Sequence, residues 1–332
     1  MEKKKALVTG GNGFLGSAIT RSLLDTGWEV RILARGQTGI PEKKEHLSWI
    51  RADIRDRGQV MQAAEGVETV FHTAALAGVW GPEENYRSIN VEGTENILEA
   101  CKAAGCRLIH SSSPSVIFDG SDMEGVDTSH PYPDTYSAAY PKTKAEAEKK
   151  VKKAAAEGLP CIILRPHLIW GPGDNHLVPR ILARSKRLAR IGKGNPPIDT
   201  VYIDNAAHAH ILADKALAAR PELSGNIYFV SDNDPVPLWD MVDAILAAGC
   251  KPPVSRRVPL KLARGLASFL EGLYTLFKLP GEPMLTGFTV KELSTAHWFD
   301  IEDLCRDTGY APLVSRKEGL NQLERYLKGT PL

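Results

Sequence analysis

Seven short runs of β-branched and apolar residues recur along the chain, and segments with helical spacing separate most of them. This alternation is typical of a parallel sheet that helices cover on both faces. We therefore predict an α/β fold built on a doubly wound, seven-stranded parallel sheet. The predicted strands span residues 5–9, 29–35, 47–53, 69–75, 107–113, 160–166 and 226–232, and the clearest helices span 15–25, 85–104 and 137–157.

A glycine-rich turn, TGGNGFLG from Thr9 to Gly16, joins the first predicted strand to the first helix. Glycines let the backbone turn tightly and approach a ligand closely, and a helix N-terminus offers free N–H groups to a pyrophosphate. The motif at this place in the chain predicts a dinucleotide-binding Rossmann sheet. The expected cofactor contacts in the turn are Gly10, Asn12, Gly13, Phe14, Leu15 and Gly16.

The end of the second predicted strand bears on the choice of cofactor. Many NAD-binding sheets carry an acid there that accepts the ribose hydroxyls. This strand ends in Leu33, Ala34 and Arg35 instead, and a guanidinium can pair with a 2′-phosphate. We therefore favour NADP(H) over NAD(H), with a merely exposed Arg35 as the alternative. Asp53 and Ile54, after the third strand, are placed to meet the adenine edge.

The regular alternation weakens after residue 167. We predict a dinucleotide-binding Rossmann domain over residues 1–167, completed by about 200–232. Residues 168–199 and 233–332 combine prolines, glycines and helical patterns, which predicts a smaller, mostly helical substrate-binding region. We expect this region to cover the carboxyl edge of the sheet, where open α/β folds bind ligands.

A tyrosine and a lysine stand four residues apart at the head of a predicted helix. Tyr140 and Lys144 therefore share one helix face, where the ammonium together with an oxidised nicotinamide would favour the phenolate and lower the tyrosine pKa. The fifth strand ends in Ser111, Ser112 and Ser113, whose hydroxyls can hold a reacting oxygen while the tyrosine transfers a proton. The sequence thus predicts a proton-transfer site beside the cofactor.

Further motifs follow along the chain: HTAA from His72, NVEGT from Asn90, YPKTK from Tyr140 and RPHLIWGPGD from Arg165. With the glycine turn, they resemble the extended short-chain dehydrogenases/reductases over essentially the whole chain. The segments AYPKTKAEAE, RPHLIWGPGDNHLVPR and ELSTAHWFD are most similar to the branch of 3β-hydroxysteroid dehydrogenases and 2-alkyl-3-oxoalkanoate reductases.

The resemblance implies roles for individual residues. Tyr140 would donate or accept the proton, Lys144 would orient the nicotinamide ribose, and Asn90 would support a proton relay through water. The family pattern SSxxV places the catalytic hydroxyl at Ser113, with Ser112 as the alternative. The further cofactor contacts that it implies are Ala74, Ala75, Pro166, His167 and Leu168.

The same resemblance implies an NAD(P)-dependent oxidoreductase that interconverts a ketone and a secondary alcohol on a hydrophobic substrate. That substrate would be a 3-oxo or 3-hydroxy acid, or a 3β-hydroxysteroid or sterol. The alternative is a sugar-nucleotide epimerase or dehydratase, although residues 116–118 read VIF where such enzymes carry VYG. A third hypothesis is a non-enzymatic, redox-sensing NADP-binding protein, which the presence of both Tyr140 and Lys144 disfavours.

Two helical patterns in the substrate-binding region leave alternatives open. Arg180, Arg184 and Arg187 form either a solvated face or a site for a substrate carboxylate or diphosphate. An apolar stripe farther along fits a core-facing helix, a roof over an apolar pocket or a contact with a membrane surface. Its members are Leu266, Phe269, Leu270, Leu273 and Phe277, with Lys261, Arg264 and Lys278 at its flanks.

Composition narrows the class of partner. The 41 basic and 40 acidic residues leave a net charge of +1, so we expect no nucleic-acid binding. The five cysteines form no CxxC pair, which disfavours disulfides and a metal site and fits a cytoplasmic protein. We expect no targeting peptide or spanning helix, while association with a membrane surface stays open. The resemblance implies a homodimer formed through the helices that carry Asn90 and Tyr140.

Overall fold

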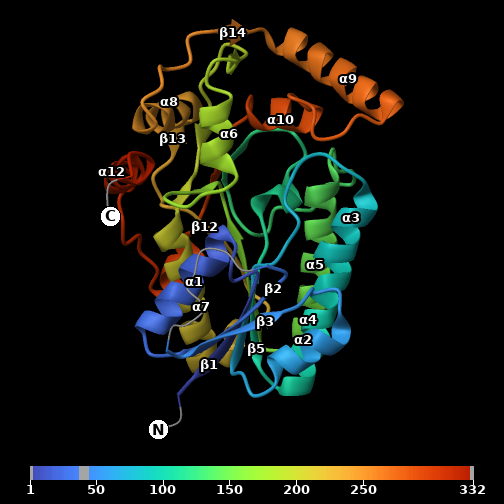
Figure 1. Cartoon of the computed structure of the whole chain (residues 1–332), viewed down its shortest axis with the longest axis vertical. Coiled ribbons are helices and arrows are strands. Elements are labelled where there is room, and N and C mark those ends of the chain that lie inside the picture. Colours follow the sequence, from blue (N-terminus) through green and yellow to red (C-terminus); the bar gives the residue numbers. More distant parts are fainter. Residues whose placement is uncertain (1–2, 37–44, 330–332) are drawn as a thin grey trace.

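The computed structural model describes residues 3–36 and 45–329 (Figure 1). Seven of its strands form one parallel sheet in the order β12-β7-β5-β4-β1-β2-β3, which confirms the predicted doubly wound α/β fold. These strands are β1 (Lys5–Thr9), β2 (Glu29–Ala34), β3 (Leu47–Arg51), β4 (Thr69–His72), β5 (Arg107–Ser111), β7 (Cys161–Pro166) and β12 (Ile227–Val230).

Several strands end earlier than their sequence patterns predicted. β3 ends two residues before Asp53, β4 ends three before Ala75, and β5 ends two before Ser113. The sequence pattern predicted strands that are too long, because many residues after each strand are still apolar or small. In the structure these residues form loops that line a cavity. The carboxyl edge of the sheet is therefore made of loops and not of extended strand.

Helices cover both faces of the sheet, as Figure 1 shows. One face carries α1 (Phe14–Asp25) and α7 (Ile203–Ala219), and the other carries α2 (Arg57–Ala64), α4 (Gly93–Ala104) and α5 (Ala139–Ala156). Neighbouring residues of β1 point to opposite faces: Val8 shares a core cluster with Ile19 of α1, while Leu7 shares one with Ile97 of α4. All four side chains are fully buried.

The helix predicted over residues 85–104 contains an irregularity that the sequence did not reveal. It consists of α3 (Glu83–Arg87), a π-helical turn (Ser88–Glu92) and α4 in direct succession, and it ends at Gly105 in the left-handed conformation. A π turn adds one residue to a helical turn and is often found at functional sites. Asn90 lies within this turn.

The expectation of only loops and helices after residue 233 is corrected by a second, small sheet. Its order is β13 (Val236–Pro237), β10 (Pro197–Ile198), β15 (His297–Phe299) and β6 (Met123–Val126). Two short pairs join β8 (Ile169–Trp170) to β11 (Val201–Tyr202) and β9 (Arg190–Ile191) to β14 (Arg257–Val258). Strands of two to four residues are too short for an alternating pattern to identify them.

The remaining helices are α6 (Leu177–Ala183), α8 (Leu238–Ala248), α9 (Leu260–Phe277), α10 (Gly287–Glu292), α11 (Glu302–Thr308) and α12 (Arg316–Leu327). Figure 1 shows α6, α8, α9 and α10 beyond the carboxyl edge of the main sheet. Among the residues described, no helix has both the length and the apolar character needed to cross a membrane. The core-facing alternative for α9 is wrong, because its buried positions are only Ala263 and Ala267 while Phe269 is 66% exposed.

Candidate active site

The glycine turn after β1 brings two pieces of backbone into very close contact. Gly10 has a φ of +68°, and its N–H donates to the carbonyl oxygen of Leu33 at 2.9 Å. A Cβ atom on Gly16 would lie 2.2 Å from the carbonyl oxygen of Gly10. Only glycine fits at residue 16. Its lack of a side chain lets the turn pack directly against the start of α1.

The N-terminus of α1 faces this turn. The residue before the helix is Gly13, which has no side chain with which to cap the first N–H groups. Those groups and the helix dipole favour an anion at this point. The backbone around Gly10 and Gly13 therefore fits the pyrophosphate of a dinucleotide.

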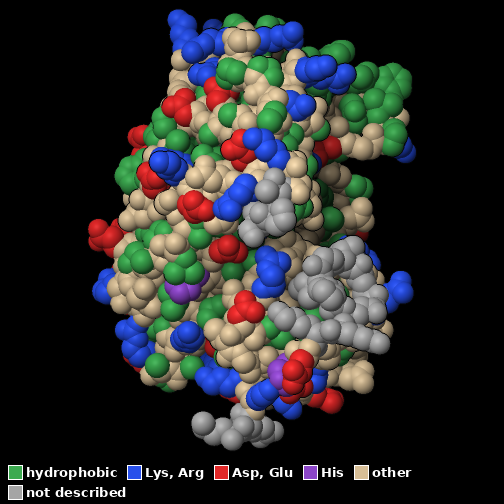
Figure 2. All heavy atoms as spheres, turned by 60° about the vertical axis from the view of Figure 1, so that its left-hand side comes forward, with side chains coloured by type: hydrophobic (Ala, Val, Ile, Leu, Met, Phe, Trp, Pro, Cys, Tyr) green, Lys and Arg blue, Asp and Glu red, His purple; other side chains and the backbone are tan. Residues whose placement is uncertain are grey.

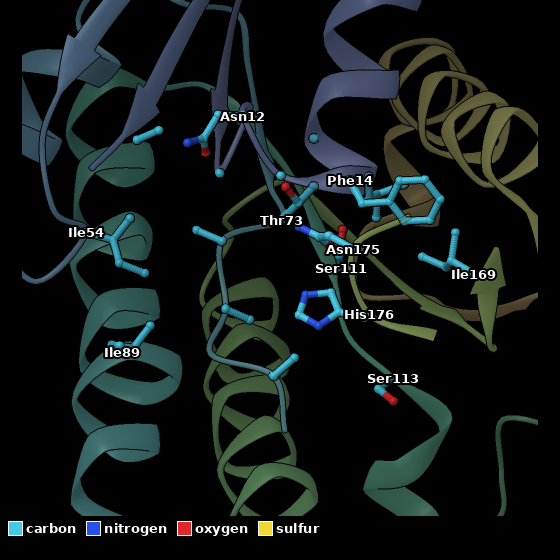
Figure 3. Close-up of a pocket in the computed structure, with 18 of the residues that line it drawn as sticks. Asn12, Phe14, Ile54, Thr73, Ile89, Ser111, Ser113, Ile169, Asn175 and His176 are labelled. Carbon is cyan, nitrogen blue, oxygen red and sulfur yellow. The ribbon is translucent and has the colours of Figure 1, made fainter. Parts of the chain in front are cut away.

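A cavity of about 600 Å³ runs from this turn along the carboxyl edge of the sheet (Figure 3). Almost all residues predicted to contact the cofactor line it: Gly10, Asn12, Gly13, Phe14, Leu15, Gly16, Arg35, Asp53, Ile54, Ala74, Ala75, Tyr140, Lys144, Pro166 and Leu168. Sequence reasoning missed other lining residues, among them Thr73, Ile89, Ile169 and Asn175. Thr73, Ile169 and Asn175 lie within quoted motifs, but the motifs did not indicate which of their residues would face a cavity.

At one end of the cavity, Arg35 and Asp53 lie after β2 and β3. Arg35 is exposed, and Asp53 forms a two-point ion pair with Arg55 at 2.8 and 3.0 Å. Hydrogen bonding from Arg55 holds the Asp53 carboxyl at a lowered pKa, and the charge of Arg35 adds to this effect. The carboxylate nearest the predicted adenine edge is thus already paired with a cation, while Arg35 faces the cavity.

Ser113 and Tyr140 come together where the cavity passes β5 and α5. Ser113 precedes a short 3-10 helix (Pro114–Ile117), and its Oγ lies 2.9 Å from the hydroxyl oxygen of Ser115. Burial raises the pKa of Tyr140, and a hydrogen bond with Ser113 partly opposes that rise. The tyrosine therefore holds its proton firmly, next to a serine hydroxyl that can share a reacting oxygen.

Lys144 is buried one helical turn along from Tyr140. Its Nζ donates to the carbonyl oxygen of Ser111 at 2.6 Å, and burial lowers its pKa to about 8. In the protein alone, burial of the phenol raises the pKa of Tyr140, and the combined effect of this ammonium and an oxidised nicotinamide stays a prediction. Lys144 nevertheless places the positive end of a long side chain at the cavity wall.

The two serines that the sequence left open have different environments. The Ser112 hydroxyl donates to Glu148 at 2.5 Å, and Glu148 also pairs with Arg165 and accepts from Tyr132. Glu148 and Arg165 are almost completely buried, so this network belongs to the interior. Of the two hydroxyls, that of Ser113 is the one bonded to Tyr140.

Asn90, in the π turn, forms hydrogen bonds with two segments beside the site. Its side-chain oxygen accepts from the Leu76 N–H at 2.7 Å, and its amide nitrogen lies 3.1 Å from both the Leu76 carbonyl oxygen and the Thr143 hydroxyl. Thr143 sits between Tyr140 and Lys144 on α5. The asparagine thus ties the loop after β4 to the helix that carries the tyrosine and the lysine.

His167 is the one predicted cofactor contact that does not line the large cavity. Its backbone N–H donates to the Val230 carbonyl oxygen at 3.1 Å. Its ring turns away from the large cavity and packs edge-on against His297 and Phe299. Burial lowers its pKa, so the ring is neutral. The chain turns at Leu168, with φ +42°, and this reversal directs Leu168 to the cofactor side and His167 to the other.

The imidazole ring of His176 projects into the middle of the site. Figure 3 shows its ring between Asn175 and Ser113. The preceding Asp174 accepts from the N–H groups of His176 and Val178, each at 2.7 Å, and so fixes the entry into α6.

Two smaller cavities adjoin the catalytic residues. One, of about 210 Å³, is lined by Ser113, Tyr140, His176, Arg180 and Glu292, and we call it the reaction cavity. The other, of about 350 Å³, is lined mainly by aliphatic side chains of α6, α8 and α9, and we call it the apolar cavity. The two share Val79, His167, Leu168, Arg180, Glu292 and His297 as walls.

Two charged residues stand where the reaction and apolar cavities meet. Arg180 forms an ion pair with Glu282, and the guanidinium side chain is 46% exposed. Glu292, the last residue of α10, has its pKa raised to about 7 by burial. A basic group and an acid with a raised pKa therefore lie at the junction.

These features define an enzyme that transfers hydride with a nicotinamide cofactor, of the extended short-chain dehydrogenase/reductase class. The glycine turn, the long cavity, Tyr140 with Ser113, and the buried Lys144 all lie where such chemistry requires them. Residues 7–260 match the 3-beta hydroxysteroid dehydrogenase/isomerase family, and the chain belongs to that family. The resemblance stated from the sequence is thereby confirmed.

Curated relatives agree with this assignment. The chain is 43% identical over 326 residues to a 2-alkyl-3-oxoalkanoate reductase of Stenotrophomonas maltophilia, covering 96% of this chain and 98% of the relative. It is 42% identical to the Shewanella oneidensis protein of the same name, covering 97% and 86%. A 3beta-hydroxysteroid-dehydrogenase/decarboxylase of Arabidopsis thaliana is 34% identical, covering 95% and 60%. The protein is a nicotinamide-dependent oxidoreductase, as predicted.

Solved structures show the same fold at lower identity. A Bacillus cereus UDP-glucuronic acid 4-epimerase is 22% identical, with a TM-score of 0.75 and coverage of 98% of this chain and 99% of the other. The Thermus thermophilus UDP-glucose 4-epimerase is 24% identical, with a TM-score of 0.73 and coverage of 98% and 100%. The likeness supports the architecture and carries no statement about substrate.

Proposed function

We propose that the protein uses NADPH to reduce the ketone of a hydrophobic 3-oxo acid to a secondary alcohol. The junction of the two substrate cavities is the observation that carries this proposal. Ser113 and Tyr140 line the small reaction cavity, while the adjoining cavity offers about 350 Å³ bounded by side chains such as Ile181 and Met241. A molecule with a ketone beside long alkyl arms matches this shape. The names of the two bacterial relatives support the same substrate class.

Arg180 supplies the basic group that a 3-oxo acid needs. It lines both cavities, so its guanidinium can reach a carboxylate whose ketone lies at Ser113 and Tyr140. A planar guanidinium binds a carboxylate through two parallel hydrogen bonds. In the protein alone Arg180 pairs with Glu282, and we propose that the substrate carboxylate replaces this partner.

The mechanism follows from the residues around the ketone. When bound, the reduced nicotinamide supplies the hydride. The Ser113 hydroxyl holds the carbonyl oxygen, and Tyr140 donates its proton to that oxygen as charge develops. The raised pKa keeps Tyr140 protonated before the reaction. The Lys144 ammonium, one helical turn along, would stabilise the phenolate that remains. Asn90 would support return of the proton through water, and it also holds α5 in register with the loop after β4.

Arg35 favours NADP(H) over NAD(H). It is an exposed guanidinium at the end of β2 on the cavity wall, where a 2′-phosphate on the adenine ribose would lie. Asp53 is the nearby acid that might be expected to select against this phosphate. Its carboxylate is already neutralised by its pair with Arg55, which lowers the repulsion.

Two other functions remain to be separated by experiment. A 3β-hydroxysteroid or sterol is also hydrophobic and presents one oxygen to Ser113 and Tyr140, so the apolar cavity accepts it in principle. A sugar nucleotide needs polar partners for several hydroxyls. The aliphatic lining of the apolar cavity supplies few of these and so argues against an epimerase or dehydratase.

Initial rates with purified protein test the proposal. The substrates are a long-chain 2-alkyl-3-oxo acid, a 3-oxosteroid and a UDP-hexose, each with NADPH and with NADH. Because 3-oxo acids decarboxylate spontaneously, the 2-alkyl-3-hydroxy acid with NADP⁺ provides the reverse assay. Turnover of only the steroid would refute the acid assignment, and UDP-hexose conversion without net cofactor use would establish the epimerase alternative.

Matched variants test the catalytic roles. Tyr140→Phe removes only the hydroxyl, and we expect a loss of about 10²-fold or more in kcat with cofactor binding retained. Ser113→Ala should lower kcat in the same assay. Ser112→Ala should instead lower stability, because it leaves one acceptor of Glu148 without its donor. Equal kcat for Ser113→Ala and the unchanged protein would remove Ser113 from the mechanism.

We also propose that the protein works in the cytoplasm as a homodimer. The five cysteines are free in the structure, which suits a reducing compartment. Light scattering of the purified protein measures the oligomeric state directly. A monomer at working concentration would contradict the dimer.

A further inference from the structure

Helix α9 carries large apolar side chains on its outer face. Leu262, Phe269 and Leu276 are 62%, 66% and 75% exposed, and they recur at helical spacing with Leu266 between them. Phe277, at the end of the helix, is 64% exposed. Figure 2 shows hydrophobic side chains gathered at the upper right of the molecule, at the height where Figure 1 places α9. We call these five residues the α9 stripe.

The opposite face of α9 is the one that packs on the protein. Ala263 and Ala267 are its buried positions, and Glu271 accepts from the Gly287 N–H of α10 at 2.9 Å. Leu270, Leu273 and Tyr274 are half-buried beside this face, so the helix presents apolar side chains both to the protein and to solvent. Ordinary surface helices turn polar residues to solvent, and a contiguous exposed apolar patch usually marks a docking surface.

The stripe continues past the end of the helix. Leu279 and Met284, in the connection to α10, are 38% and 48% exposed. Met284 also lines the apolar cavity, as do Ala263 and Leu266 of α9. The exposed patch and the roof of the apolar cavity are thus formed by the same segment.

The charge around the stripe favours an anionic partner. Between residues 256 and 279 the chain has five basic residues and one acidic residue. The basic residues are Arg256, Arg257, Lys261, Arg264 and Lys278, all of them exposed. The acidic residue is Glu271, which is engaged with α10. Since the whole chain carries a net charge of only +1, this positive charge is concentrated locally.

A lipid surface satisfies both observations at once. Apolar side chains enter the boundary between headgroups and acyl chains, while flanking cations contact anionic headgroups. A second copy of the same face would bring like charges together. With 18 residues, α9 is about 27 Å long and would lie in the plane of the surface.

We propose that α9 and the connection after it dock the protein on membranes that contain anionic lipid, with the mouth of the apolar cavity against the lipid. Amphiphilic molecules held in the membrane then enter the apolar cavity beneath α9 without crossing water. Docking depends on the α9 stripe and on the basic residues beside it, and it does not depend on catalysis.

Co-sedimentation of the full-length protein with vesicles tests the proposal. Vesicles of phosphatidylcholine alone are compared with vesicles that also contain phosphatidylglycerol, at low and high salt. We expect binding to the anionic vesicles that weakens as salt rises. Phe269→Glu and Leu276→Glu should each weaken binding by about tenfold or more, because each variant would place a charge in the lipid boundary.

The matched control is Leu313→Glu, which changes an equally exposed leucine, 64% exposed, in the loop before α12. It should leave vesicle binding unchanged, and thermal unfolding should show that all three variants fold. Equal binding of Phe269→Glu and the unchanged protein would overturn the proposal, as would no binding to anionic vesicles. A dimer that Phe269→Glu dissociates, without vesicle binding, would assign the stripe to a second copy instead.

Discussion

The acid at the junction of the substrate cavities makes the stability of the protein depend on pH in a predictable direction. Burial raises the pKa of Glu292 from 4.5 to about 7. Between these values the native state holds a proton that the unfolded chain has released. The free energy of unfolding therefore falls as the pH rises through this window. Above a pH of about 7 the contribution of the protonated Glu292 to stability is lost.

The size of the effect follows from the same pKa values. A rise from 4.5 to about 7 corresponds to about 3 kcal/mol of differential stability. Because Glu292 borders two cavities that admit water, we expect a measured effect of about 1–3 kcal/mol. The titratable and basic groups that share the reaction cavity with it are Tyr140, His167, His176, Arg180 and His297.

Glu292→Gln isolates this contribution, since the amide keeps the neutral shape at every pH. Urea unfolding at pH 5 and pH 8 should show that the variant gains about 1–3 kcal/mol relative to the unchanged protein between the two conditions. Other titrating groups, such as Asp199 and Asp232, affect both proteins alike and cancel in the comparison. An identical difference in stability at the two pH values would refute the reasoning.

Three further predictions concern binding. Arg35→Asp should move cofactor preference from NADPH toward NADH in steady-state rates, and an unchanged ratio would show that Arg35 does not meet the phosphate. Gly16→Ala should lose dinucleotide binding in fluorescence titrations, because the added Cβ would lie 2.2 Å from the Gly10 carbonyl oxygen. Arg180→Met should raise KM about 10-fold or more for a 3-oxo acid but not for its methyl ester. Equal losses for the acid and the ester would contradict carboxylate recognition.

The sequence predicted the sheet well because burial on both faces imposes one simple pattern. Strands such as β1 and β7 contain short apolar runs, residues 6–8 and 161–164, and the glycine turn permits few alternatives. The four-residue spacing of Tyr140 and Lys144 also translated directly into positions along one cavity wall. In each case the local sequence alone determines the geometry.

The sequence predicted less wherever contacts between distant segments decide the geometry. The reversal at Leu168 separated His167 from the cofactor cavity, and no local pattern indicates such a turn at a leucine. Ser112 and Ser113 carry the same side chain, and their contacts with Glu148 and Tyr140, respectively, distinguish them in the structure. The pKa of Tyr140 depends on burial among several elements, which spacing to a lysine does not measure.

The π turn at Ser88–Glu92 has a consequence for attempts to stabilise the enzyme. Each residue of an α-helix advances it by about 100°, so deleting one residue from the turn would restore a regular helix and swing the preceding segment around the axis of α4. Asn90 would then no longer reach both Leu76 and Thr143. A deletion that makes this helix more regular should therefore break the link between the loop after β4 and α5, which sets a limit on stabilising the enzyme by idealising its backbone.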